Sequence, residues 1–171
     1  MSTDALSSCL EDLVKFSSIN SRAIDANVVA FLKDVGIPFY FGLKFDPWAL
    51  LYNNSVNELL MFNNLSYLVI WKGVLGVNIC LSQENQGIYC IDDTGSSEFP
   101  ITFINSNINK CSTFICLLNR LYDMYDVDVD YATRKKLYLQ IKDQMYQLDI
   151  QAFAAEINWW SAALYDLEPL D

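Results

Sequence analysis

Residues 75–92, LGVNICLSQENQGIYCID, decide the fold of this chain. From Leu75 to Leu81, apolar side chains recur at every second residue, which predicts a β-strand with one buried face. The polar segment from Ser82 to Gly87 predicts a turn, and Ile88 to Asp92 predicts the strand that returns beside the first. The stretch therefore predicts a β-hairpin, and with it an antiparallel sheet.

Further strand-like segments lie on both sides of this hairpin. Glu58–Phe62 and Leu65–Trp71, joined by a turn at Asn63-Asn64, predict a second hairpin. Leu65–Trp71 is apolar on both faces and so is expected at the centre of the sheet. Phe39–Phe45 predicts an edge strand or an extended entry loop, and Phe99–Ile104 predicts a last short strand. Together these segments predict a mostly antiparallel sheet of about five to six strands.

Helical periodicity precedes the strands. A first helix is expected over Thr3–Ser17, where leucines recur at helical spacing. A second helix is expected to begin near Asn20 or Ser21, either of which can cap it. Gly36 and Pro38 predict its end, because a glycine followed by a proline terminates helices.

Helical periodicity returns after the strands. One helix is expected to start at a cap within Asn105–Asn107 and to run through Tyr125. A second is expected over Ala132–Leu148, and a third, capped by Asp149, through about Leu167. Helices before and after a sheet, rather than alternating with strands, predict a segregated α+β fold.

Composition predicts one folded, cytoplasmic domain over residues 1–171. Hydrophobic residues make up 53% of the chain and aromatic residues 14%, enough to offset the entropy of ordering. The opening residues lack the basic and apolar regions of a secretory segment, and no apolar run is long enough to cross a membrane. The five cysteines are odd in number and contain no C-x-x-C pair, which predicts reduced, mostly buried thiols.

The charge balance is strongly acidic. The chain carries 21 acidic and 11 basic residues, a net charge of -10, and no histidine. Such a chain is repelled by nucleic acid and by anionic membranes, so neither is an expected partner. The acidity is equally consistent with solubility alone and with binding to a basic protein.

The sequence lacks the residues that common catalytic and phosphate-binding motifs require. Without histidine, a nucleophile lacks its commonest activating base. Gly73 and Gly76 flank a bend between two strands, whereas a phosphate-binding loop opens a helix. The sequence predicts no catalytic centre and no cofactor.

An aspartate-rich connector imitates a calcium-binding loop in part. Asp126, Asp128 and Asp130 have the spacing of its first three ligands. The required glycine is replaced by Tyr131 and the bidentate glutamate by Leu137. The sequence therefore predicts no metal site, and the connector is expected to be hydrated.

Several landmarks recur in order over most of the chain from about residue 30 onward. They are Phe31-Leu32 with Val35-Gly36-Ile37-Pro38, Tyr89-Cys90-Ile91-Asp92 with Thr94-Gly95, Phe103-Ile104-Asn105-Ser106 before Phe114, and Leu148-Asp149 with Ala152, Phe153 and Trp159 or Trp160. In these landmarks the chain resembles the SUKH superfamily, and within it the fourth group of immunity proteins. It departs from the family in the polar loop from Ser82 to Gly87 and in the aspartate-rich connector.

The resemblance implies an α+β fold and a non-enzymatic inhibitor of a bacterial polymorphic or contact-dependent toxin. Such toxins are often nucleases or nucleic-acid deaminases, and an acidic surface can cover the cationic cleft of a nuclease. The expected partner is thus a cognate toxin domain with a basic surface. Candidate contact residues form two acidic groups, one at a sheet turn (Asp92, Asp93, Glu98) and one at the helical connector (Asp123, Asp126, Asp128, Asp130).

Two other functions are compatible with the sequence. A small hydrolase or transferase using carboxylates would place two convergent acids in a deep pocket. A scaffold or adaptor of the same fold would share the partner-binding surface but not the toxin. The sequence indicates neither the oligomeric state nor whether the two acidic groups share one face.

Overall fold

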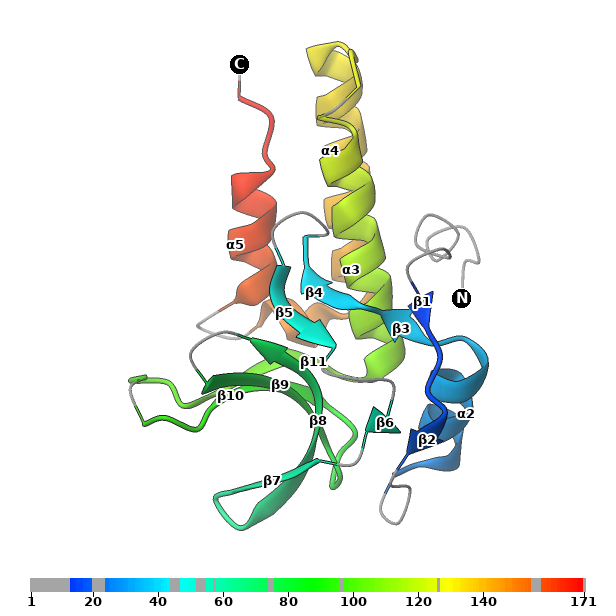
Figure 1. Cartoon of the computed structure of the whole chain (residues 1–171). Helices are drawn as coiled ribbons and strands as arrows, with labels where there is room; N and C mark the ends of the chain where they lie inside the picture. The colour runs from blue at the N-terminus through cyan, green and yellow to red at the C-terminus, as the bar shows by residue number, and fades with distance from the viewer. Residues whose placement is uncertain are drawn as a thin grey trace.

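The computed structural model describes residues 13–19, 24–43, 47–51, 55–56, 58–73, 76–95, 97–125, 127–154 and 158–170 (Figure 1). These residues form a single α+β domain in which helices pack against a curled sheet. The predicted fold class is confirmed.

Antiparallel pairing orders the seven-stranded sheet as β11-β10-β9-β8-β5-β4, with β7 on the same edge of β8 as β5. Two further pairs are short: β1 (Leu13–Val14) runs antiparallel to β3 (Ile37–Pro38), and β2 (Ser18–Ile19) parallel to β6 (Ser55–Val56). The bounds of the seven strands are β4 (Tyr40–Gly42), β5 (Pro47–Leu51), β7 (Leu59–Phe62), β8 (Leu65–Gly73), β9 (Val77–Ser82), β10 (Ile88–Asp92) and β11 (Ile101–Asn105).

Both predicted hairpins are confirmed. β9 pairs with β10 around the polar turn, and β7 pairs with β8 around Asn63-Asn64. Asn63 and Asn64 have φ angles of 50° and 63°, as a two-residue hairpin turn requires, and asparagine tolerates this left-handed region. β4 lies at one end of the strand order, so the predicted edge strand is also confirmed.

The helices are α2 (Ala26–Asp34), α3 (Ile108–Asp123), α4 (Tyr131–Leu148) and α5 (Trp159–Asp166), with a 3-10 helix η3 (Ile150–Phe153) between α4 and α5. Asn107 caps α3, within the predicted range, through a hydrogen bond that its side chain accepts from Lys110 N. α3 and α4 run antiparallel beside each other, with α5 next to them (Figure 1).

The prediction for the first helix is wrong where the structure describes it. Leu13 and Val14 form β1, and Phe16 N donates to Leu32 O over 3.1 Å while its ring enters the core. Pairing with distant residues thus overrides the local helical periodicity. The rest of that segment, together with Asn20 and Ser21, lies outside the described residues; α2 begins after a cap at Asp25.

Two further expectations are corrected. Asp149 does not cap the last helix: its side chain makes no cap hydrogen bond to η3, and α5 starts separately after a cap at Asn158. β9 was expected to be half-buried but is buried on both faces from Asn78 to Ser82, because the sheet curls and carries apolar side chains on each face.

One aromatic cluster forms the centre of the main core. Phe41 is fully buried and lies within 6 Å, centroid to centroid, of Trp48, Trp71, Trp159 and Trp160. The core reaches from the first described segment to the end of α5, so one core unites the described chain.

Candidate partner-binding surface

The face of the sheet away from the helices carries its own apolar cluster. Side chains alternate between the two faces of a strand. Those that meet α3, α4 and α5 belong to the main core, whereas no helical residue belongs to the second cluster. We call this second surface the helix-free face. Its cluster consists of Leu60, Phe62, Tyr67, Val69, Cys80, Tyr89, Ile91 and Ile101.

Aromatic rings cross the helix-free face from β8 to β11. The rings of Tyr67 and Tyr89 meet edge to face at 5.8 Å, and those of Tyr89 and Phe103 at 5.5 Å. Between the two tyrosines lies Cys80, which is fully buried although no helix among the described residues contributes to this cluster. Small Cys80 therefore lets the tyrosines pack across β9. Tyrosine combines an apolar ring with a polar tip and is enriched in protein interfaces.

Acidic groups surround this aromatic row. Burial raises the pKa of Cys80, and the negative charges of Asp93 and Glu58 add to the shift. The pKa of Tyr67 is raised by burial as well, with Glu84 contributing. These carboxylates are therefore close enough to act electrostatically on the helix-free face. Glu58 is paired with Lys72 at 2.7 Å.

The charge on this part of the sheet has a single sign. Between Lys72 and Lys110 the sequence contains no lysine or arginine, but it contains Glu84, Asp92, Asp93 and Glu98. β9, β10, β11 and their connections thus add only negative charge. The sequence alone shows that this stretch contains no lysine or arginine. The structure adds that its strands are neighbours in one sheet, so the negative charges gather in one region.

The structure brings the first predicted acidic group together in the connection between β10 and β11. Asp93 and Glu98 are exposed there. Asp92 is half-buried, and its Oδ1 accepts hydrogen bonds from Thr94 N at 2.9 Å and Thr94 Oγ1 at 2.6 Å. Asp92 therefore shapes the turn, while Asp93 and Glu98 present their charges to solvent.

The second predicted group lies elsewhere. Asp123 is exposed at the end of α3, Asp128 and Asp130 are exposed between α3 and α4, and Asp126 lies outside the described residues. Figure 1 shows this connector at the top of the helices, far from the β10–β11 connection at the left of the sheet. The two groups therefore lie in separate parts of the molecule.

Basic side chains and hydrogen bonds lie close to the acidic group at the helical connector. Asp130 caps α4, and hydrogen bonds from Thr133 to its carboxylate lower the pKa of Asp130. Arg134 donates to Val127 O at 3.2 Å, and Lys135 pairs with Glu168 at 2.8 Å. Two basic side chains thus lie beside this connector, whereas β9, β10, β11 and their connections contain none.

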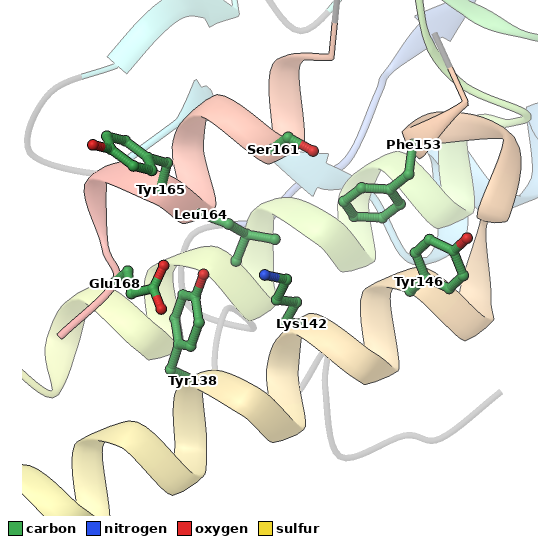
Figure 2. Close-up of a pocket in the computed structure, with 8 residues that line it drawn as sticks. All are labelled: Tyr138, Lys142, Tyr146, Phe153, Ser161, Leu164, Tyr165 and Glu168. Atoms are coloured by element: carbon green, nitrogen blue, oxygen red, sulfur yellow. The ribbon is translucent and has the colours of Figure 1, made fainter.

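A concave groove separates α4 from α5 (Figure 2). Its cavity of about 300 Å³ is lined by Tyr138, Lys142, Tyr146, Phe153, Ser161, Leu164, Tyr165 and Glu168. The Lys142 ammonium lies 5.6 Å from the centre of the Tyr138 ring, a cation–π contact. Glu168 is the one carboxylate of the lining, so the groove does not hold the pair of convergent acids expected of a carboxylate-dependent enzyme.

Asp149 has a role that the sequence analysis missed. Its buried carboxylate accepts hydrogen bonds from Ser106 N at 2.8 Å, Asn105 Nδ2 at 3.1 Å and Ser106 Oγ, with Lys110 Nζ at 3.5 Å. Asn105 Oδ1 in turn accepts from Trp160 Nε1 at 3.1 Å. The network joins the end of β11 to the ends of α4 and α5. The sequence did not predict this network because its members are far apart in the chain. Asn105 is separated from Asp149 by 44 residues and from Trp160 by 55.

The buried thiols are poor nucleophiles. Burial raises the pKa of Cys111 and Cys80, and raises that of Cys90 to about 12. Cys116 is buried as well, so the predicted burial holds for every described cysteine; Cys9 lies outside the described residues. Thiols reluctant to ionise are inert at neutral pH.

Within the described part of the chain, no group of cysteine, aspartate or glutamate side chains is placed to hold a metal ion. Nor does any helix described there combine the length and apolarity needed to cross a membrane. No family model, no curated protein and no solved structure is similar enough to this chain to be matched with it.

Proposed function

We propose that this chain is an immunity protein, which neutralises a cognate toxin domain by direct, stoichiometric binding in the cytoplasm. The observation that carries the proposal is the helix-free face, where a row of aromatic rings adjoins a region of the sheet that bears only negative charge. Binding requires no cofactor and no catalysis by this chain.

Charge and aromatic side chains have separate parts in such binding. Negative charge speeds the encounter with a basic surface and orients it, and this effect weakens as salt increases. Tyrosines that become fully desolvated supply most of the binding free energy in many interfaces. The helix-free face offers both, and the proposed partner surface is the cationic cleft of a nuclease or nucleic-acid deaminase.

The resemblance to the SUKH immunity proteins supports the same function. Several of its landmark residues, which are distant in the sequence, lie in the one buried network around Asp149. These are Asn105, Ser106, Asp149 and Trp160. We assign this network a structural role, because it holds the helices to the edge of the sheet and leaves the opposite face open.

The first test is co-expression of this chain with the toxin encoded beside its gene. We expect survival of the cells and a 1:1 complex on gel filtration. If the cells die and no complex forms, the immunity function is wrong. If a different protein co-purifies and the toxin does not, the chain is an adaptor.

The second test compares the two acidic groups on that complex. Glu84→Gln, Asp93→Asn and Glu98→Gln together should weaken binding about tenfold and reduce its salt dependence. Asp123→Asn with Asp128→Asn is the matched control and should leave both unchanged. Asp92 and Asp130 are kept, because they hold a turn and cap a helix. The reverse result would place the partner at the helical connector.

A further inference from the structure

Strand β7 has an edge that no described strand pairs. Its hydrogen bonds go to β8 in a known register, since Val69 N donates to Glu58 O over 3.0 Å. Antiparallel residue pairs alternate between hydrogen-bonded and non-bonded. The bonded pairs in this hairpin are therefore Glu58 with Val69, Leu60 with Tyr67 and Phe62 with Leu65. It follows that Leu59 and Met61 direct their backbone N–H and C=O groups away from β8.

The side chains at these two positions are apolar and open to solvent. Leu59 is 45% exposed and Met61 is 64% exposed. From residue 59 to residue 71 the sequence contains no charged residue and no proline. Natural edge strands are usually protected by lysine, proline or a bulge, because an open edge pairs with other strands. β7 has none of these protections.

We propose that β7 pairs antiparallel with β7 of a second copy of this chain, about a two-fold axis at Leu60. In this register Leu59 lies opposite Met61 of the second copy, and Leu60 opposite its own counterpart. Leu59 and Met61, whose backbone groups point away from β8, then lie opposite each other across the two copies. Each Leu59–Met61 pair exchanges two backbone hydrogen bonds. The pairing satisfies the open backbone groups on both copies at once, as an isologous interface must.

The same register also buries the exposed side chains. Leu59 and Met61 lie on one face of β7, so those of both copies gather into one apolar group across the axis. Two chains that each carry a net charge of -10 repel one another, and the uncharged stretch from residue 59 to residue 71 is where they approach with little repulsion. A contact this short is expected to dimerise in the micromolar range rather than more tightly.

Analytical ultracentrifugation of the purified chain tests the proposal. We expect a reversible monomer–dimer equilibrium at micromolar concentration. Met61→Lys should abolish it by placing like charges at the interface. Leu139→Lys is the matched control, because Leu139 is 54% exposed on α4, and this variant should still dimerise. A wild-type monomer throughout the micromolar range, or a dimer that Met61→Lys leaves intact, overturns the proposal.

A cross-linking experiment tests the register independently. Directly opposed residues of a non-bonded pair have Cα atoms about 4.5 Å apart, within the range of a disulfide. Leu60→Cys should therefore form an intermolecular disulfide on mild oxidation. Leu59→Cys should do so far less, because it faces Met61 of the other copy. The wild-type chain is oxidised in parallel to account for Cys9. Equal cross-linking at both positions would exclude the proposed register.

Discussion

The two faces of the sheet are both apolar, but they are built from different residues. The covered face packs Phe41 of β4 and Trp71 of β8 against helical side chains such as Phe114 of α3. The helix-free face carries the row of Tyr67, Tyr89 and Phe103. Both faces bury their central side chains, but among the described residues only the covered face is packed against helices.

The polar atoms of the aromatic side chains show the same difference. On the covered face, Trp71 Nε1 donates to Pro38 O at 3.0 Å and Trp160 Nε1 to Ile104 O at 3.2 Å, so each indole is fixed inside the fold. On the helix-free face, the Tyr89 hydroxyl accepts from Asn85 Nδ2 at 2.9 Å in an exposed setting. The covered face thus stabilises the fold, while the helix-free face keeps partly open rings that a partner can bury.

The largest effect is expected from truncating one ring in each apolar cluster, Phe114 of the main core and Tyr89 of the helix-free cluster. Phe114 is fully buried, 5.1 Å from the Trp160 ring, so Phe114→Ala should reduce the free energy of unfolding by about 3–5 kcal/mol. Tyr89 is half-buried, so Tyr89→Ala should cost only about 1–2 kcal/mol. Urea unfolding followed by circular dichroism measures both.

Binding should rank these variants in the opposite order. Tyr89→Ala should weaken the toxin complex by about 2 kcal/mol, because an interfacial tyrosine is lost. Phe114→Ala, assayed below its unfolding transition, should bind as the wild type does. Equal losses of stability, or normal binding by Tyr89→Ala, would remove the distinction between the two faces.

A smaller loss is expected where the helices are held to the covered face. Asp149→Asn keeps the shape of the side chain but places an amide among the donors of Asn105 and Ser106. The lost charge-assisted hydrogen bonds should reduce the free energy of unfolding by about 1–3 kcal/mol. Asp143→Asn, on the exposed side of α4, is the control and should have no measurable effect. A neutral Asp149→Asn would mean that the helices are held by apolar contacts alone.

The comparison of faces also separates what the sequence predicts from what it does not. Strand periodicity and turn residues are local, so both hairpins, the edge strand β4 and the cap at Asn107 followed from them. Leu13 and Val14 have helical spacing but pair with β3, because distant contacts decide short ambiguous segments. The two acidic groups were identified from the sequence, but their separation was not, since it depends on the path of α3 and α4.

The smallest perturbation, alkylation of single thiols, compares local opening at the two faces. Cys80 and Cys90 lie on neighbouring strands, with Cys80 in the helix-free cluster and Cys90 in the main core. Burial raises the pKa of both, so neither ionises in the folded chain at pH 8, and labelling requires local opening. Cys80 is fully buried next to Tyr89 on the helix-free face, whereas Cys90 keeps 8% of its surface exposed on the covered face.

Iodoacetamide labelling followed by mass spectrometry measures both rates, and Tyr89→Ala should accelerate the labelling of Cys80 while leaving that of Cys90 unchanged. Both rates should rise with pH up to about 8.5, where an opened thiol ionises. Because the folded pKa values lie above that of the unfolded chain, the stability contributed by the protonated thiols is complete below about pH 8.5 and is lost as the pH rises beyond it. Labelling of Cys80 and Cys90 at one common rate would show that the two faces open together, and that the helix-free face is as much a part of the cooperative core as the covered one.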